Sequence, residues 1–305
     1  MQHISRLRNL LLAAGFGIAA FLAQDSTQRA QAPEIVTEAN EKLRQFPLHV
    51  RGAEKVIKHE VPQAKYCLVN IKQRHYASPE RLEHALMNEG VTGRQEIREK
   101  MLESYAKVNR VQKDIYMILE QLGAKYVLAE GALYTKEFEP FTKEEAGEFY
   151  EQVRDEMQQG LGIGGKRARM AYLANLIQQE ADSEELPLKE LRDEYARLAE
   201  DEERYRYIPG ACVLMAAQEK IILVPPESHD LNARAWQART HEELDAVQNE
   251  RENHVMKLAS ELDCLLPVMV YGKQHDFKDN IEKWNRENPD LKFSLIEIMP
   301  QSMQQ

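Results

Sequence analysis

The chain has 305 residues and carries 50 acidic against 40 basic side chains, which gives a net charge of −10. This charge argues against nucleic acid as a partner, because nonspecific binding depends on Lys and Arg neutralising phosphates. Apolar residues make up 43% and charged residues 30%, proportions typical of a soluble globular body. The three cysteines are far apart and lack Cys-x-x-Cys spacing, which argues against a disulfide framework or a cysteine-based metal site.

The first 32 residues have the pattern of an export signal. Arg6 and Arg8 precede an apolar run at 10–23, and a polar spacer rich in Gln, Ser and Thr follows. The run is short for a membrane span, so it predicts a signal peptide, with an uncleaved N-terminal anchor as the alternative. We therefore expect an exported protein that touches a membrane only through this segment. Residues 33–305 are expected to form a single domain.

The body of the chain alternates short apolar runs with longer amphipathic or polar segments. Apolar runs of this length, rich in Val, Ile, Leu and Tyr, are typical of strands buried on both faces of a parallel sheet. Strands alternating with helices predict an α/β fold with a mostly parallel sheet of about five strands, of which the first four are parallel. The predicted strands lie at 66–71, 125–129, 221–224, 267–271 and 293–298.

Helices are predicted between these strands. Apolar residues recur every three or four positions over 97–122, which predicts a long helix that Gly123 ends. Residues 34–60 predict a short amphipathic helix and a polar connector, and 231–262 predict one long polar helical stretch. The segment at about 137–205 is helical in pattern and strongly acidic, which indicates a large helical insertion with a solvated surface.

A glycine-rich stretch at 160–166 contains the GxxxxGK part of a phosphate-binding loop. An acidic helix precedes it instead of a buried strand, and Arg167 stands where the magnesium-binding Ser or Thr belongs. We therefore interpret this stretch as a mobile hinge or lid loop between helices, and not as a nucleotide site.

Four predicted strands are followed by ionisable side chains. If the strands are parallel, these side chains meet at the carboxyl edge of the sheet, where ligand sites of open α/β folds lie. A carboxylate and several imidazoles converging there can activate a water or bind a metal. Each residue alone is more often an exposed loop residue, but the repetition over four strands favours a shared site. The residues, in strand order, are His75, Glu130, the pair Glu227 and His229, and His275.

These motifs resemble, in the same order, those of the superfamily that joins erythromycin esterases, ChaN-type haem-associated proteins and the Tiki/TraB group. There, a first strand ends in Gly-Glu-x-His or Gly-x-x-His, similar to 72–75 here, and a second ends in Glu, as at Glu130. A Glu-rich turn is similar to 225–229. A helix with an arginine, similar to Arg251, leads to a last Gly-x-x-His, which matches 272–275.

The resemblance covers about residues 64–300. It departs from the pattern at Lys72 and Gln73, which replace the usual Gly and Glu, and Gln73 cannot ionise. It implies a strand-end site with three catalytic groups and four ligand-binding groups. These are His75, Glu130 and His275 as catalytic groups, and Gln73, Glu227, His229 and Arg251 as ligand-binding groups.

Two classes of function stay open. One is an exported hydrolase in which the strand-end histidines and Glu130 activate water for attack on a small-molecule or peptide substrate. The other is a protein that binds haem or another small ligand in the same crevice, and a scaffold whose chemistry has decayed is a third reading. Haem and a divalent metal both stay open as cofactors. Because rim residues contribute little to a core, we expect alanine at Glu130 or His275 to remove turnover and leave stability nearly unchanged.

Overall fold

The computed structural model describes residues 36–131, 139–161, 165–179, 188–262 and 264–304. The predicted export signal lies outside these residues, and so do residues 162–164 of the glycine-rich stretch. Within the described ranges, no helix is both long enough and apolar enough to cross a membrane.

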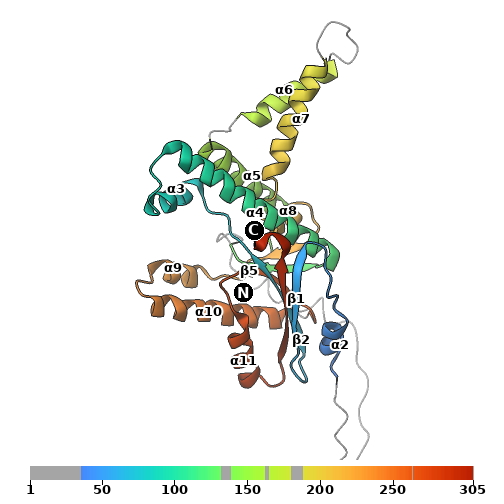
Figure 1. Ribbon diagram of the computed structural model, residues 1–305. Coiled ribbons are helices and arrows are strands. Elements are labelled where there is room, and N and C mark those ends of the chain that lie inside the picture. Colours follow the sequence, from blue (N-terminus) through green and yellow to red (C-terminus); the bar gives the residue numbers. More distant parts are fainter. Residues whose placement is uncertain (1–35, 132–138, 162–164, 180–187, 263, 305) are drawn as a thin grey trace, which may run out of the picture. The chain divides into compact units, whose positions relative to one another are not determined.

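The centre of the body is a six-stranded sheet in the order β1-β6-β2-β5-β3-β4 (Figure 1). Every neighbouring pair is parallel except β1 and β6, which are antiparallel. The α/β fold with a mostly parallel sheet is therefore confirmed, and all five predicted strands are present. The strands are β1 (Ala53–His59), β2 (Tyr66–Gln73), β3 (Tyr126–Ala129), β4 (Ile222–Val224), β5 (Val268–Gly272) and β6 (Phe293–Pro300).

Strand β1 was not expected, because the sequence suggested a polar connector there. Its residues Glu54 and Lys55 are exposed, and the rest of the strand is only partly buried. An edge strand needs a partner on one side only and tolerates charged side chains that discourage pairing with other molecules. For this reason it lacks the continuous apolar run by which the interior strands are found.

Ten α-helices pack around the sheet in the described part of the chain. Helix α4 ends at Gly123, whose φ of 59° is the left-handed conformation that favours glycine at this position. The stretch predicted as one helix at 231–262 is two, because Thr240 starts a new helix by accepting a hydrogen bond from the Glu243 N–H at 3.1 Å. The helices are α2 (Glu38–Gln45), α3 (Pro79–Asn88), α4 (Arg94–Leu122), α5 (Lys143–Gly160), α6 (Lys166–Gln179), α7 (Leu188–Tyr205), α8 (Ala211–Ala217), α9 (His229–Gln237), α10 (His241–Glu261) and α11 (Phe277–Glu287).

The two faces of the sheet bury separate apolar cores. Val69 and Ile71 of β2 point into a core shared with α4 and α8, whereas Leu68 points into a core shared with α10 and α11. Both faces of β2 are buried, which explains its unbroken apolar run. The sheet is thus a fixed frame, and its carboxyl edge holds the loops that follow β2, β3 and β5.

The helical insertion consists of α5, α6 and α7. Helix α5 ends at Gly160 and α6 begins at Lys166, so the glycine-rich stretch joins two helices. The ammonium group of Lys166 lies 2.5 Å from a carboxylate oxygen of Asp201 in α7. This lysine is therefore engaged within the insertion, while the hinge or lid role of the stretch stays a prediction.

Candidate functional site

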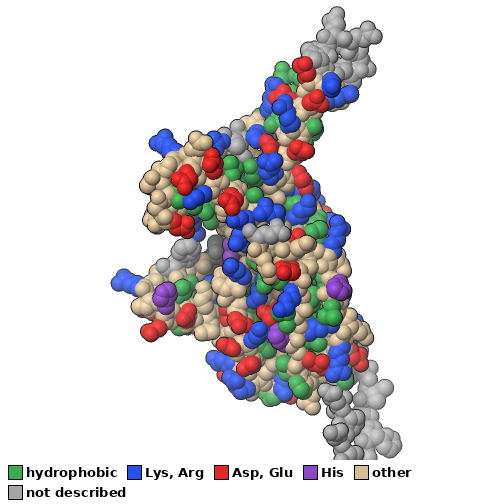
Figure 2. All heavy atoms as spheres, in the orientation of Figure 1, with side chains coloured by type: hydrophobic (Ala, Val, Ile, Leu, Met, Phe, Trp, Pro, Cys, Tyr) green, Lys and Arg blue, Asp and Glu red, His purple; other side chains and the backbone are tan. Residues whose placement is uncertain are grey.

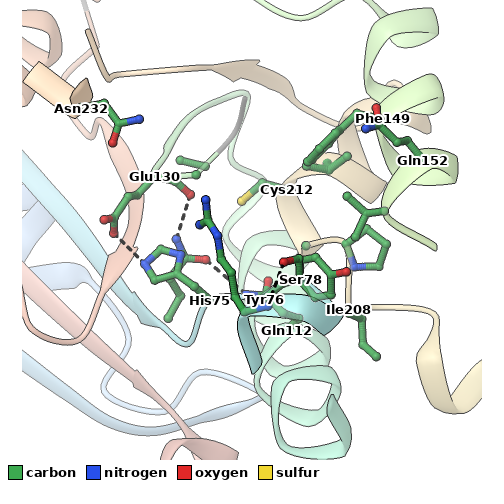
Figure 3. A pocket seen from close by; sticks show the side chains of 18 of the residues that line it. His75, Tyr76, Ser78, Gln112, Glu130, Phe149, Gln152, Ile208, Cys212 and Asn232 are labelled. Carbon is green, nitrogen blue, oxygen red and sulfur yellow. Dashed lines mark hydrogen bonds and ion pairs between the residues drawn. The ribbon is translucent and has the colours of Figure 1, made fainter. Parts of the chain in front are cut away.

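Glu130 lies at the centre of a cluster at the carboxyl edge of the sheet. Strand β5 pairs with β2 on one side and with β3 on the other, so the ends of these three strands are adjacent. The Nε2 atom of His75, after β2, lies 2.9 Å from Glu130 Oε2, and Nε2 of His275, after β5, lies 3.0 Å from Oε1. Figure 3 shows His75 and Glu130 joined at the side of a cavity. The structure thus brings these two histidines together on one carboxylate.

The carboxylate of Glu130 accepts hydrogen bonds from four nitrogen atoms. In addition to the two histidines, Arg251 lies 3.3 Å from Oε1, and the Gly272 backbone N–H donates to Oε2 at 2.7 Å. A carboxylate has about four acceptor positions, so none is left over here. Burial favours the neutral acid, but the hydrogen bonds from His275 and His75 outweigh it and hold the pKa of Glu130 far below its usual value. Glu130 is therefore a permanent anion that organises the groups around it.

His275 is enclosed by two carboxylates. Only 1% of its side chain is exposed, and its Nδ1 lies 2.7 Å from Glu252 Oε1 while Nε2 faces Glu130. Burial opposes a charge on the ring, but the hydrogen bonds to Glu130 and Glu252 outweigh it and raise the pKa of His275 to about 9. Since each ring nitrogen faces an acceptor, His275 is an imidazolium ion at neutral pH.

His75 differs from His275 in being open to the cavity, with 35% of its side chain exposed. Glu130 can only accept, so the Nε2 atom of His75 carries the proton, and Nδ1 of the neutral ring carries a lone pair. No residue of the described ranges makes a hydrogen bond to Nδ1, which lies on the side of Gly131. His75 is thus held in one tautomer with its basic nitrogen available.

Arg251 and Glu227 form the second buried ion pair of the cluster. Both side chains are buried, and Arg251 contacts Glu227 as well as Glu130. The other oxygen of Glu227 lies 3.5 Å from the Gly131 backbone N–H. The three carboxylates of Glu130, Glu227 and Glu252 thus face two cations, the imidazolium of His275 and the guanidinium of Arg251.

Gln73 occupies the position where the resemblance leads one to expect a glutamate. Its amide nitrogen donates to the backbone carbonyls of Glu130 and Val270 at 3.1 and 3.2 Å. Its amide oxygen accepts from Gln112 at 3.2 Å. A carboxylate cannot donate to two carbonyl groups, so the amide suits this position better. The hydrogen bonds of Gln73 thus link the end of β2 to β5 and to the residue that follows β3. Gln73 also lines the cavity.

Lys72 also differs from the first motif of the superfamily that the sequence resembles, and the structure shows which groups its side chain contacts. Its ammonium group donates to the backbone carbonyl of His275 at 2.6 Å and lies 3.4 Å from Glu297. The side chain is buried, so the lysine holds the loop after β5 in place from beneath. It supports His275 and does not line the cavity.

One predicted ligand-binding residue lies apart from this cluster. His229 is the first residue of α9, is exposed, and is not among the residues that line the cavity. Conversely, Glu252 and Gln112 were missed by sequence reasoning. Glu252 follows Arg251 directly in a helix that reads as polar, and its burial is the only feature that separates it from solvated neighbours.

The cavity beside His75 has a volume of about 620 Å³. Ser78 and Arg81 line it near α3, and Asn232 and Ala235 line it from α9; Figure 2 shows a recess between these two helices. Helix α5 contributes an apolar wall, and the amides of several glutamines contribute polar groups. Such a mixed lining suits a small amphipathic molecule.

Cys212 also lines the cavity, and Figure 3 shows it between Glu130 and Phe149. Burial raises the pKa of its thiol to about 12, so the sulfur is protonated at neutral pH. A protonated thiol is a weak nucleophile.

A divalent metal does not fit the cluster. Among the described residues, no group of three or more His, Cys, Asp or Glu side chains could hold a metal ion. Both oxygens of Glu130 already accept from N–H groups, and the Arg251 guanidinium lies against the same carboxylate. A cation there would have to displace these donors and face a like charge.

No protein-family model, curated protein or solved structure matches the chain. The fold and the site define an α/β protein with a His–Glu–His cluster at the carboxyl edge of its sheet.

Proposed function

We propose that the cavity is the active site of a hydrolase in which His75 is the general base. The observation that carries this proposal is the 2.9 Å hydrogen bond between His75 and the permanently ionised Glu130, on a ring that opens to the cavity. A carboxylate behind an imidazole fixes its tautomer and stabilises the imidazolium that forms during proton transfer. The resemblance to the erythromycin esterase, ChaN and Tiki superfamily supports the same chemistry, and the N-terminal pattern supports export.

The proposed step begins with a water beside Nδ1 of His75. The ring takes one proton from the water, the oxygen attacks the carbonyl carbon of an ester or amide, and the imidazolium returns the proton to the leaving group. Glu130 positions His75, while His275 and Glu252 fix the orientation of Glu130.

The substrate class follows from the cavity. Its volume of about 620 Å³ suits a small molecule, and Phe149 and Val153 offer an apolar wall opposite polar amide groups. We therefore propose a small amphipathic ester or amide as the substrate.

The test is a panel of small esters and peptides, assayed with and without a chelator. His75→Asn keeps a planar polar side chain but removes the base, and His229→Asn is the matched control outside the cavity. We expect His75→Asn to lower kcat/KM by about 100- to 10,000-fold, the usual contribution of general base catalysis, and the control to keep full activity. Equal activity in both variants would contradict the assignment.

Ligand binding without turnover is the second candidate, favoured by one observation. His75 presents a ring nitrogen to a cavity with aromatic walls at Tyr76 and Phe149, and this nitrogen would hold the iron of a bound haem. The resemblance supplies a precedent for haem. A Soret band that appears on haem titration and is lost in His75→Asn but kept in His229→Asn, without turnover of any substrate, would establish binding in place of hydrolysis.

A further inference from the structure

The amide side chains that line the cavity differ in how far their hydrogen-bonding groups are already used within the protein. Gln73 and Gln112 bond to each other, and their remaining donors and acceptors bond to backbone groups. Gln152 donates to a carboxylate of its own helix at 3.0 Å. A bound molecule would have to displace these contacts. The other two lining amides, Gln248 and Asn232, keep groups that a bound molecule can use.

Arg251 determines which end of the Gln248 amide is available. Its Nη1 atom donates to Gln248 Oε1 at 3.2 Å, and since a guanidinium group can only donate, the oxygen of the amide must lie at this end. No residue of the described ranges accepts a hydrogen bond from the amide nitrogen, and the side chain is half-buried. Gln248 therefore has two N–H donors, in a known orientation, to offer a molecule in the cavity.

Asn232 contributes a second amide from the neighbouring helix α9. Its side chain lines the same cavity, and Figure 3 shows it on the side opposite Phe149 and Gln152. Within the described part of the chain, its amide makes no hydrogen bond. Helices α9 and α10 contact each other, and the ion pair of Arg234 with Glu250, at 2.6 Å, joins them at the surface. This pair of helices thus carries both of the available amides.

The charges beside Gln248 indicate what kind of group fits there. Arg251 already contacts the carboxylates of Glu130 and Glu227. A substrate carboxylate would be a third anion around one guanidinium, and an ammonium group would face the N–H donors of Gln248 and the like charge of Arg251. An uncharged oxygen meets neither penalty and accepts readily from an amide N–H.

We propose that Gln248 is a specificity-determining residue whose amide nitrogen binds an uncharged oxygen of the substrate, from a carbonyl or a hydroxyl group. Asn232 binds a second such group from α9. This inference names the substrate class of the proposed hydrolase and rests on that proposal: a small ester or amide that carries further uncharged oxygen groups. His75 follows β2, whereas Gln248 belongs to α10, so recognition and chemistry can be changed separately.

The experiment is NMR titration of the full chain with four small benzene derivatives. Toluene has no polar group, acetophenone adds an uncharged oxygen, benzoate adds an anion and benzylamine adds a cation. Gln248→Glu keeps an oxygen for Arg251 and removes the N–H donors. Gln237→Glu makes the same change of charge at an exposed residue of α9 outside the cavity. Circular dichroism confirms that both variants are folded.

The quantity to compare is the dissociation constant of toluene divided by that of acetophenone. We expect Gln248→Glu to lower this ratio by about tenfold, the usual worth of one hydrogen bond, and Gln237→Glu to leave it unchanged. In the wild type, acetophenone should bind more tightly than benzoate and benzylamine. An unchanged ratio in Gln248→Glu would overturn the inference, as would a wild type that binds no probe or prefers a charged one.

This test does not need turnover, so the two proposals can fail separately. Selective acetophenone binding that depends on Gln248, in a protein that hydrolyses no ester or peptide, would overturn the hydrolase and leave the amide as part of a ligand site. Turnover that depends on His75, with a probe ratio that ignores Gln248, would overturn the substrate class and leave the hydrolase.

Discussion

The two histidines that contact Glu130 make hydrogen bonds of nearly the same length. They differ in how far their side chains are buried and in how many carboxylates they face. Their distances to the carboxylate are 2.9 Å for His75 and 3.0 Å for His275, but 35% of the first side chain is exposed and 1% of the second. His275 also faces Glu252, and this second carboxylate makes it a fixed cation. Burial and the number of carboxylates therefore distinguish the two rings, and their distances to Glu130 do not.

The largest effect is expected from Glu130→Gln, which removes the anion common to both histidines. Buried His275 and Arg251 would lose their shared counter-charge, and breaking a buried ion pair costs about 3–5 kcal/mol. Urea unfolding should show this loss, together with a loss of activity. Glu103→Gln, which breaks an exposed pair with Lys107, is the control and should leave the unfolding free energy nearly unchanged. From the sequence, which places Glu130 at the rim of the sheet, we expected a change at this residue to leave stability nearly unchanged. Its buried contacts with His275 and Arg251 lead to the opposite expectation.

Alanine substitutions at His75 and His275 distinguish the proposed general base from the buried cation. His75→Ala should lower activity by about 100- to 10,000-fold and change stability by less than about 1 kcal/mol, because the ring is partly exposed. His275→Ala should destabilise the fold by about 3 kcal/mol, because it leaves buried Glu252 without its cation and removes one of the two cations beside Glu130. Paired measurements of thermal unfolding and turnover test this, and equal stability losses in the two variants would contradict the comparison.

The pH dependence of stability should report His275. Its folded pKa of about 9 lies above the ordinary value of 6.5, so the folded state holds the proton more tightly than the unfolded state. The contribution is fully present below pH 6.5 and is lost as pH rises through about 9, with a total on the order of 3 kcal/mol. Unfolding free energies measured from pH 6 to 10 should show this decline in the wild type, and His275→Gln should lack it.

A smaller effect is expected from Gly272→Ala. A Cβ atom there would lie 2.7 Å from the amide of Gln274 and 2.8 Å from Nε2 of His75, the atom that binds Glu130, so both side chains must shift. We expect about a tenfold loss of activity, a fraction of the general base contribution. Gly147→Ala in α5 is the matched control, since nothing lies within 4 Å of its new Cβ. That change should keep activity and stabilise the helix by up to about 1 kcal/mol. Similar activity in both variants would show that the His75 position tolerates movement.

Much of the frame could be predicted because interior strands are buried on both faces. The apolar runs that became β2 and β5 are visible in the sequence, and parallel pairing then places Glu130 and both histidines at one edge. Strand β1 lacks such a run because it lies at the sheet edge, where charged side chains are tolerated.

The inner support of the site could not be predicted. Glu252 lies among charged and polar residues of α10, and only the packing of this helix on the sheet turns its side chain toward His275. Gln112 of α4 likewise reads as a surface amide until its contact with Gln73 is seen. In each case the decisive fact is a contact between residues more than 20 positions apart, which local patterns do not encode.

The strand order has a consequence for folding during synthesis. Strand β2 is made early in synthesis, yet both of its neighbours, β5 and β6, lie beyond residue 267. Any shorter nascent chain holds an apolar strand with two unpaired edges, and long-range parallel pairing of this kind is slow and exposed to aggregation. The sheet, and the cluster at its edge, can therefore assemble only when the last part of the chain has emerged.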